Sequence, residues 1–303
     1  MLKVLLGVSR PNFLTLTLCC IVLAATFSWY QTGAISSADF TLVMIIAMAA
    51  HISVNAFNEY FDFRSGLDFV TRKTPFSGGT GTLVANPGGS QAALALAVAT
   101  LLIVIGGGLW LSYVQGWRLL LLGIPGVLLI YGYTQYVNRW AFICLLAPGI
   151  GFGLLMTAGA ILVFSHSLSY SGWLLSAIIC LLVSNLLLLN QFPDVEADRQ
   201  FGRRHFPIIL GRTRSSHIYF GFLTASYLLL ILGISLNWLP PHTLLALLSL
   251  LPVPGLVAGI RRYAEQPDRL TPYLGMNVLH CHLYPLLLAA GLFWAGLSSP
   301  VQG

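Results

Sequence analysis

Runs of about 20 mostly apolar residues recur along this 303-residue chain, and they constrain its fold more than any other feature. Only 8% of the residues are charged, against about a quarter in soluble domains. Lipid offers no hydrogen-bond partner to an open backbone, so each run must cross the bilayer as a helix. The chain is therefore predicted to be an all-α membrane protein with nine transmembrane helices around a central cavity. We expect the spans near residues 12–32, 38–62, 91–115, 118–136, 141–165, 171–191, 214–237, 241–260 and 273–297.

The basic residues predict the orientation of these spans. With nine spans, the N-terminus and the loops after spans 2, 4, 6 and 8 share one side, which holds fourteen of the fifteen lysines and arginines. Only Arg118 falls on the other side, so we expect a cytoplasmic N-terminus. The basic pI then reflects topology, and no nucleic-acid partner is expected. Six arginines are predicted to be topology determinants at the lipid headgroups: Arg203, Arg204, Arg212, Arg214, Arg261 and Arg262.

Small residues within the spans are interpreted as packing residues. All five cysteines lie in apolar stretches and are expected in the core, not in disulfides or a zinc site. The "GGG" at 106–108 and the "GIGFG" at 149–153 lack a strand-to-helix context, so they indicate close helix packing instead of nucleotide binding.

Six of the nine acids form two clusters at the predicted cytoplasmic ends of spans 2 and 6: Glu59, Asp62 and Asp68, then Asp194, Glu196 and Asp198. Acids near a membrane are costly and repel one another, so positive charge should compensate them. In "NAFNEYFDFRSGLD", helical spacing places Asn55, Asn58 and Asp62 on one face. Asp68 would turn away on a continuous helix, but Ser65-Gly66 can break the helix and bring it back.

The second cluster, "NQFPDVEADRQFG", places Asn190, Asp194 and Asp198 on one helix face. Pro193 should loosen this helix and free a backbone carbonyl near Leu189, and Gly202 should end it. Two such units suggest a degenerate internal repeat. We expect one domain over residues 1–303, made of two four-helix units, about 10–165 and 171–260, plus a ninth helix. If the units face each other, they form a carboxylate-lined cavity.

Carboxylate and amide oxygens favour Mg²⁺, which is usually held by few carboxylates together with substrate phosphates. A diphosphate bridging the two clusters is expected to find further positive charge on Arg72, Lys73 and Arg199. With a lipid tail in the bundle, such a site suits the ionisation of an allylic diphosphate and attack by an electron-rich acceptor.

These residues resemble the UbiA-type intramembrane prenyltransferase superfamily. "NQFPDVEAD" fits the family motif Asn-x-x-x-Asp-x-x-x-Asp, and "NAFNEYFDFRSGLD" fits the variant of the menaquinone-type branch, which prenylates 1,4-dihydroxy-2-naphthoate. The resemblance implies that Asp62, Asp68, Asp194 and Asp198 engage Mg²⁺-diphosphate, and that Asn58 and Asn190 support them. It also implies diphosphate contacts for Lys73 and Asn55. The implied partners are a polyprenyl diphosphate, an aromatic acceptor and membrane lipid, in a multi-pass protein of a bacterial inner membrane with its active site facing the cytoplasm.

The acceptor is less constrained by the motifs. Enzymes of that branch usually carry "YSxxP…YxGLGE" after span 4, whereas this chain reads "YGYTQYVNRWAF" and lacks the Pro and Glu. Tyr131, Tyr133 and Tyr60 are candidates for the acceptor pocket. Other acceptors therefore stay open, namely 4-hydroxybenzoate, homogentisate or a glycerol lipid, and so do the prenyl length and the oligomeric state.

An ion-coupled transporter is the competing function, since transporters also carry repeats and intramembrane acids. Their sites lie near the midplane of the membrane, whereas these acids are predicted at one mouth. Among the histidines, His51 is equally consistent with a cavity role and with packing. Asn277 and His280 are expected to form an interhelical hydrogen-bonding patch.

Overall fold

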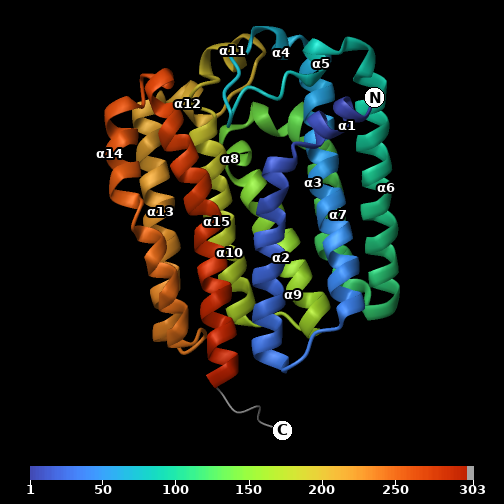
Figure 1. The fold of residues 1–303 in the computed structure, drawn as a ribbon, viewed down its shortest axis with the longest axis vertical. Helices are drawn as coiled ribbons and strands as arrows, with labels where there is room; N and C mark the ends of the chain where they lie inside the picture. The colour runs from blue at the N-terminus through green and yellow to red at the C-terminus, as the bar shows by residue number, and fades with distance from the viewer. Residues whose placement is uncertain (299–303) are drawn as a thin grey trace.

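The structure is a computed structural model that describes residues 1–298, and within that range it contains helices and no strand. Nine segments of the described chain are long and apolar enough to cross a membrane, as the sequence predicted, and they run side by side (Figure 1). The spans are α2 (Pro11–Thr32), α3 (Ser37–Ser65), η1–α6 (Pro87–Gln115), η2–α7 (Trp117–Gln135), α8–η4–α9 (Ala141–Ser165), α10 (Tyr170–Asn190), α13 (Arg212–Ser235), η5–α14 (Pro241–Tyr263) and α15 (Pro267–Ser298). The shorter helices are α1 (Leu2–Ser9), α4 (Leu67–Val70), α5 (Thr82–Ala85), η3 (Val137–Arg139), α11 (Val195–Gln200) and α12 (Phe206–Ile209).

Serines and glycines at the ends of the spans explain why they begin and end where they do. Ser36 and Ser169 cap α3 and α10, because their hydroxyls accept hydrogen bonds from the backbone N–H groups of Asp39 and Gly172. At the other end of α3, Gly66 adopts a left-handed conformation with φ 92°, which costs glycine little. The break predicted at Ser65-Gly66 is therefore confirmed.

Close packing of small residues holds the fifth span against α10. Added Cβ atoms on Gly149 and Gly153 would collide with the α10 backbone at Cys180 and Ser176, so the "GIGFG" interpretation is confirmed. The segment Ile150–Thr157 (η4) is a π-helix, and it follows Pro148 inside the same span. The "GGG" prediction holds only for Gly107, which faces Ile46, because Gly106 and Gly108 have no neighbour within 4 Å of a Cβ.

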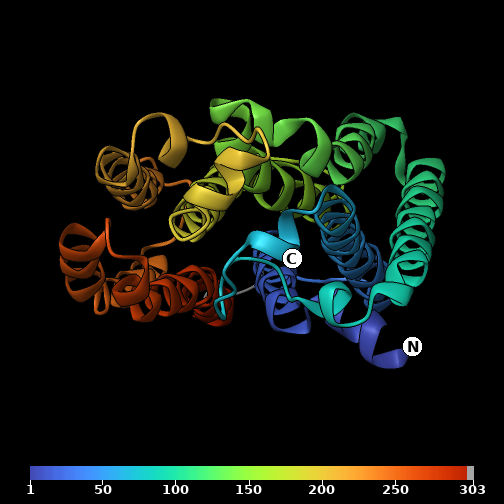
Figure 2. The ribbon, with the colours of Figure 1, turned by 90° about the horizontal axis from the view of Figure 1, so that it is seen from above.

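Helix α10 is the most buried of the nine spans of the described chain, and other spans lie around it (Figure 2). Its leucines and isoleucines belong to the largest apolar core, together with residues of α2, α9 and α15. All five cysteines are buried and free, as predicted for core residues.

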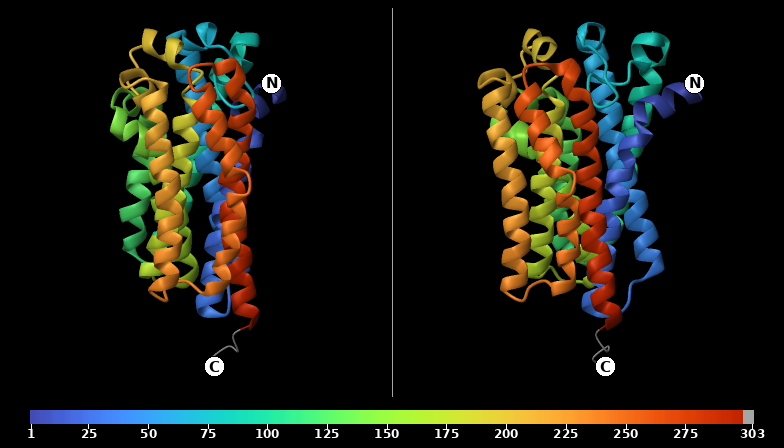
Figure 3. Two further views of the ribbon diagram at one scale, coloured as in Figure 1. Left: turned by 90° about the vertical axis from the view of Figure 1, so that its left-hand side faces the viewer. Right: turned by 60° about the vertical axis from the view of Figure 1, so that its left-hand side comes forward.

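The short helices α1, α4, α5, α11 and α12 gather at one end of the bundle, and the described end of α15 lies at the other (Figures 1 and 3). Both acid clusters lie at the first end, on or beside α3, α4 and α11. Five spans fall within residues 11–165 and three within 170–263, so the predicted boundaries do not divide the bundle into two units of four. The internal repeat itself stays a prediction.

Candidate active site

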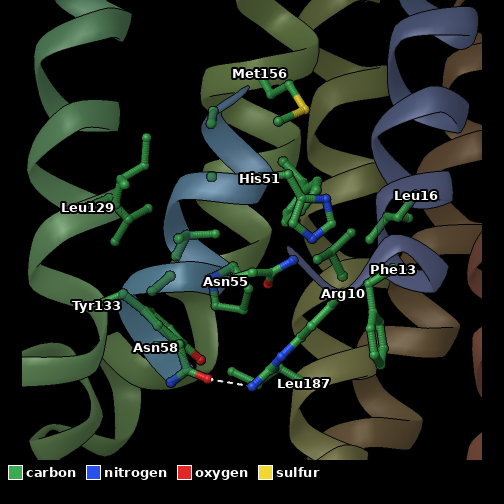
Figure 4. A pocket seen from close by; sticks show the side chains of 18 of the residues that line it. Arg10, Phe13, Leu16, His51, Asn55, Asn58, Leu129, Tyr133, Met156 and Leu187 are labelled. Carbon is green, nitrogen blue, oxygen red and sulfur yellow. Dashed lines mark hydrogen bonds between the residues drawn. The ribbon is translucent and has the colours of Figure 1, made fainter. Parts of the chain in front are cut away.

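A cavity of about 890 Å³ opens at the end that carries the short helices and continues deep into the bundle. Its mouth is lined by acids, amides and basic residues from both clusters, and its depth is lined by aliphatic residues of α3, α6, α7 and α9. In Figure 4, Asn58 and the guanidinium of Arg10 lie near the bottom of the view, and the apolar side chains of Leu16, Leu129 and Met156 lie above them along the cavity. The site therefore joins a charged headgroup region to an apolar chamber.

Four residues of the first cluster line the mouth. Asn55, Asn58 and Asp62 lie on the same face of α3, and the turn at Gly66 places Asp68 of α4 beside them. The Nδ2 atom of Asn58 donates a 3.0 Å hydrogen bond to Asp62, and that of Asn55 donates a 3.0 Å bond to the carbonyl of Ser9. Asn55 thus also fixes the junction between α1 and α2.

The second cluster reaches the cavity through a broken helix and not through a continuous one. Helix α10 ends at Asn190, a turn follows, and α11 begins at Val195, yet Asn190, Asp194 and Asp198 all line the cavity. The expectation of a freed carbonyl at Leu189 is wrong, because that oxygen accepts a 3.1 Å hydrogen bond from the N–H of Phe192. Pro193 has no N–H to donate to this carbonyl, and the tight turn lets the N–H of Phe192 donate in its place.

The loop 71–81, here called the strap, lies over the end of the bundle that carries the short helices (Figure 2), and it contacts both acid clusters. Its Thr80 donates to the carboxylate of Glu59 through both its N–H (2.9 Å) and its hydroxyl (2.8 Å). Its Gly78 N–H lies 3.3 Å from Oδ2 of Asp194. Lys73, also on the strap, lines the cavity as predicted for a diphosphate contact.

Two arginines that sequence reasoning did not assign to the site compensate its acids. Arg203 forms ion pairs with Asp62 and with Asp198, and its side chain is only 18% exposed. Its interpretation as a headgroup topology determinant is therefore wrong. Arg10 pairs with Glu59 at 2.5 Å. It also donates to Oδ1 of Asn58 at 2.9 Å, the bond that is dashed in Figure 4. Only the expected need for positive charge near the clusters pointed to such partners.

Arg212 also departs from the headgroup interpretation. It is buried, bonds the carbonyl of Phe192 and pairs with Glu196, and so fixes α13 to the α10–α11 turn. The other members of that set are exposed: Arg204, Arg214, Arg261 and Arg262.

Four residues predicted for the site do not line the cavity. Arg72 is exposed and pairs with Asp268, and Arg199 is exposed on α11 because it follows Asp198 by one position and points to another face. Tyr131 is 45% exposed and packs edge-on against Phe57 and Phe61 on the outer side of α3. Tyr60 packs against Phe61 and is likewise absent from the lining, so Tyr133 alone of the three predicted tyrosines faces the cavity.

The mouth contains oxygen atoms that lack a donor. Buried oxygens of Asp68, Asn190 and Asp194 have no hydrogen-bond partner within the described chain, and all three residues line the cavity. Hard oxygen donors left without partners fit a cation such as Mg²⁺. Among residues 1–298, however, no three His, Cys, Asp or Glu side chains already form a cluster that could hold a metal. The carboxylates are thus close to one cavity but not assembled around a common point.

Burial weakens the acidity of two of these carboxyls. Burial, together with the nearby charges of Glu59 and Asp62, raises the pKa of Asp68 to about 7. Burial and the charge of Asp198 raise the pKa of Asp194 to about 7. Both groups therefore change charge near neutral pH.

The histidine interpretations have mixed outcomes. His51 lines the cavity and also forms a 2.8 Å hydrogen bond with Thr17, so both of its roles are present. The patch predicted at Asn277 and His280 is confirmed, because they bond the hydroxyls of Tyr219 and Tyr227 on α13.

A family model described as the UbiA prenyltransferase family matches residues 17–279. A 2-carboxy-1,4-naphthoquinone phytyltransferase of Synechocystis is 26% identical over 97% of this chain and 94% of its own length. A 1,4-dihydroxy-2-naphthoate octaprenyltransferase of Bacillus subtilis is 26% identical over 78% of this chain and 76% of its own.

Solved structures share the fold. A UbiA homologue from Aeropyrum pernix superposes with a TM-score of 0.70 at 20% identity, covering 93% of this chain and 98% of that one. A UbiA homologue from Archaeoglobus fulgidus, solved with DMAPP and Mg²⁺, superposes with a TM-score of 0.59 at 13% identity, covering 94% and 99%.

Proposed function

Since the chain belongs to the UbiA prenyltransferase family, we propose that it transfers a polyprenyl group from an allylic diphosphate to an aromatic acceptor of the 1,4-dihydroxy-2-naphthoate type. One observation carries the proposal: both aspartate clusters open into a single cavity whose depth is apolar. The names of the Synechocystis and Bacillus relatives support the choice of a naphthoate acceptor.

The diphosphate would lie at the mouth. Asp62, Asp68, Asp194 and Asp198 would hold Mg²⁺ with support from Asn58 and Asn190, and the three unpartnered oxygens there support this assignment. When bound, Mg²⁺ would neutralise the charge of the departing diphosphate. Lys73 and Asn55 also face the mouth and would orient the diphosphate oxygens.

The prenyl tail would extend into the apolar depth of the cavity. The lining of α3 runs from Asp62 back to Val43, a rise of about 28 Å at 1.5 Å per residue. That is close to the thickness of the hydrocarbon core, about 30 Å. The chamber excludes water from the allylic carbon, which protects a carbocation from hydrolysis until the acceptor attacks.

The acceptor ring would lie against Tyr133, the one predicted tyrosine that lines the cavity near the mouth. A phenol face stabilises an adjacent cation and packs against an aromatic acceptor. The transporter alternative is less well supported, since the acids lie at one end of the bundle and not halfway along it. We also propose that this end faces the cytoplasm, because the basic loops cluster there.

The proposal is tested with purified protein in nanodiscs, Mg²⁺, labelled farnesyl or geranylgeranyl diphosphate and a panel of acceptors. We expect product with 1,4-dihydroxy-2-naphthoate and little with 4-hydroxybenzoate, homogentisate or a glycerol lipid. Asp62→Asn and Asp194→Asn should abolish product, whereas the exposed acid variant Asp268→Asn should retain it. Efficient transfer to another member of the panel would overturn the acceptor assignment, and full activity of Asp62→Asn would overturn the site.

A further inference from the structure

Arg203 joins the two aspartate clusters directly. Its Nη2 donates to Oδ1 of Asp62 and its Nη1 donates to Oδ1 of Asp198 at 3.1 Å. All three side chains are largely buried, at 18%, 12% and 4% exposure. A single guanidinium therefore bridges α3 and α11 inside the mouth of the cavity.

The remaining oxygens of these two acids also have partners. Oδ2 of Asp62 accepts from Asn58 at 3.0 Å, and Oδ2 of Asp198 lies 2.9 Å from Nε2 of His205. Asp68 and Asp194 differ, because each keeps a buried oxygen without a donor. Of the four aspartates in the mouth, Asp62 and Asp198 thus have every oxygen bonded without a metal. These are the two aspartates that Arg203 bridges.

A guanidinium and a divalent cation compete for the same carboxylate oxygens, since both are bound by the same lone pairs and their charges repel. We infer that Arg203 is a built-in counter-cation that competes with Mg²⁺ for Asp62 and Asp198 and then binds the diphosphate. This inference rests on the function proposed above. It also explains why the carboxylates are near one another but not assembled into a metal cluster.

The displaced guanidinium needs another anion, and the cavity offers few. Glu59 is already bonded by Arg10 and Thr80, and the unpartnered oxygens of Asp68 and Asp194 would be taken by the incoming metal. A diphosphate supplies the planar pairs of oxygens that a guanidinium binds best. Metal alone must therefore break the ion pairs of Arg203 and leave its guanidinium without an anion. Metal bound together with diphosphate gives that guanidinium a new anion in exchange. The two ligands should bind cooperatively.

The test measures metal and diphosphate binding separately, with no turnover. Free Mn²⁺, which shares the oxygen preference of Mg²⁺, is followed by electron paramagnetic resonance in the absence of any diphosphate. The Kd of the unreactive analogue farnesyl thiolodiphosphate is measured by calorimetry at a fixed, saturating free Mg²⁺ concentration. The proteins are wild type, Arg203→Gln, Arg203→Lys, the exposed neighbour control Arg204→Gln, and Asp62→Asn.

We expect opposite changes in Arg203→Gln: Mn²⁺ binds about tenfold more tightly and the analogue about tenfold more weakly, within the usual range of coupling between ligands. Arg203→Lys keeps the charge but loses the planar fork of donors, so it should move Mn²⁺ affinity in the same direction by less. This variant serves if the glutamine variant fails to fold. Arg204→Gln should match wild type. Unchanged or weaker Mn²⁺ binding in the folded Arg203 variants would overturn the inference.

The Asp62→Asn arm separates two kinds of failure. Mn²⁺ binding that is lost in Asp62→Asn but unchanged in the Arg203 variants overturns only the role of Arg203. Mn²⁺ binding that is equal in wild type and Asp62→Asn overturns the metal assignment itself, and the competition with it.

Discussion

Individual acids at the mouth differ sharply in their surroundings although they share one cavity. Asp62 and Asp198 have a partner on every oxygen, whereas Asp68 and Asp194 keep unpartnered buried oxygens and have pKa values raised to about 7. A carboxyl whose pKa is raised on folding is protonated and neutral below that pKa. The same carboxyl ionises near pH 4 in the unfolded chain, so the metal-free fold loses stability relative to the unfolded chain as the pH rises from about 4 to 7.

These two acids predict a pH-dependent metal affinity. Mg²⁺ or Mn²⁺ needs ionised carboxylates and must displace protons below pH 7, so affinity should fall as the pH is lowered. We expect the Kd for Mn²⁺ to rise by about tenfold or more between pH 8 and pH 6, one power of ten per pH unit for each proton displaced. Titrations of wild type and Asp194→Asn at pH 6, 7 and 8 measure this, and the variant should show a shallower slope. An unchanged Kd over that range would contradict the prediction.

Glu59 has a structural role, in contrast to the neighbouring aspartates. It is fully buried and accepts from both Nε and Nη2 of Arg10 and from the N–H and hydroxyl of Thr80, so it ties α2 and the strap to α3. Glu59→Gln leaves the buried guanidinium without its counter-charge and should destabilise the protein by about 3 kcal/mol.

Thermal unfolding in detergent tests this role. The matched control is Glu265→Gln, whose carboxylate is 59% exposed in its contact with Arg212 and should contribute under about 1 kcal/mol. Equal melting temperatures for the two variants would argue against a structural role for Glu59.

Among the elements, the strap owes its path to glycine. Gly78, Gly79 and Gly81 have φ values of 80°, 69° and 72°, a region that disfavours other residues. A Cβ on Gly79 would lie 2.9 Å from Oδ1 of Asp68 and 3.4 Å from Oε1 of Glu59. The strap therefore approaches the carboxylates as closely as it does because it has no side chain there.

Gly79→Ala should accordingly lower activity more than stability. We expect strain of about 1–2 kcal/mol from the left-handed backbone, and a loss of activity of about tenfold or more because Asp68 is displaced. Gly88→Ala is the control, since its Cβ would meet no atom within 4 Å. Initial rates and melting temperatures of the two variants decide the matter, and wild-type rates in Gly79→Ala would show that the strap tolerates a side chain.

For the whole molecule, the shape of the bundle suggests how long a tail it accepts. Glycines of α7 and α9, among them Gly123 and Gly159, line the deep part of the cavity and leave space where larger side chains would fill it. A Cβ on Gly159 would meet only Leu122, at 3.8 Å, so substitution there extends into the chamber without a backbone collision.

Gly159→Phe should therefore shorten the accepted prenyl chain. We expect kcat/KM for a long polyprenyl diphosphate to fall at least about tenfold relative to that for geranyl diphosphate, since a blocked tail loses buried area. Gly221→Phe on α13 is the control, because a Cβ there would meet no atom of residues 1–298 within 4 Å and Gly221 does not line the cavity. Unaltered selectivity in Gly159→Phe would mean that the tail leaves the chamber before reaching this residue.

The sequence by itself determined the nine spans, the all-helical fold and the presence of both aspartate motifs at one end. Each of these depends on local properties: a span must be apolar over about 20 residues, and the turns at Gly66 and Pro193 are set by backbone chemistry. The positions of Asp62, Asp68, Asp194 and Asp198 at one mouth follow from the number of helices between them.

Only the tertiary structure decided which charged and aromatic residues face that mouth. Arg203 and Arg204 are adjacent in the loop between α11 and α12, yet one bridges the two clusters and the other is exposed. Tyr131 and Tyr133 are two positions apart on α7, and only Tyr133 faces the cavity. Local sequence cannot separate the members of each pair. The direction of a side chain depends on how its helix or loop is placed against elements that are distant in the chain.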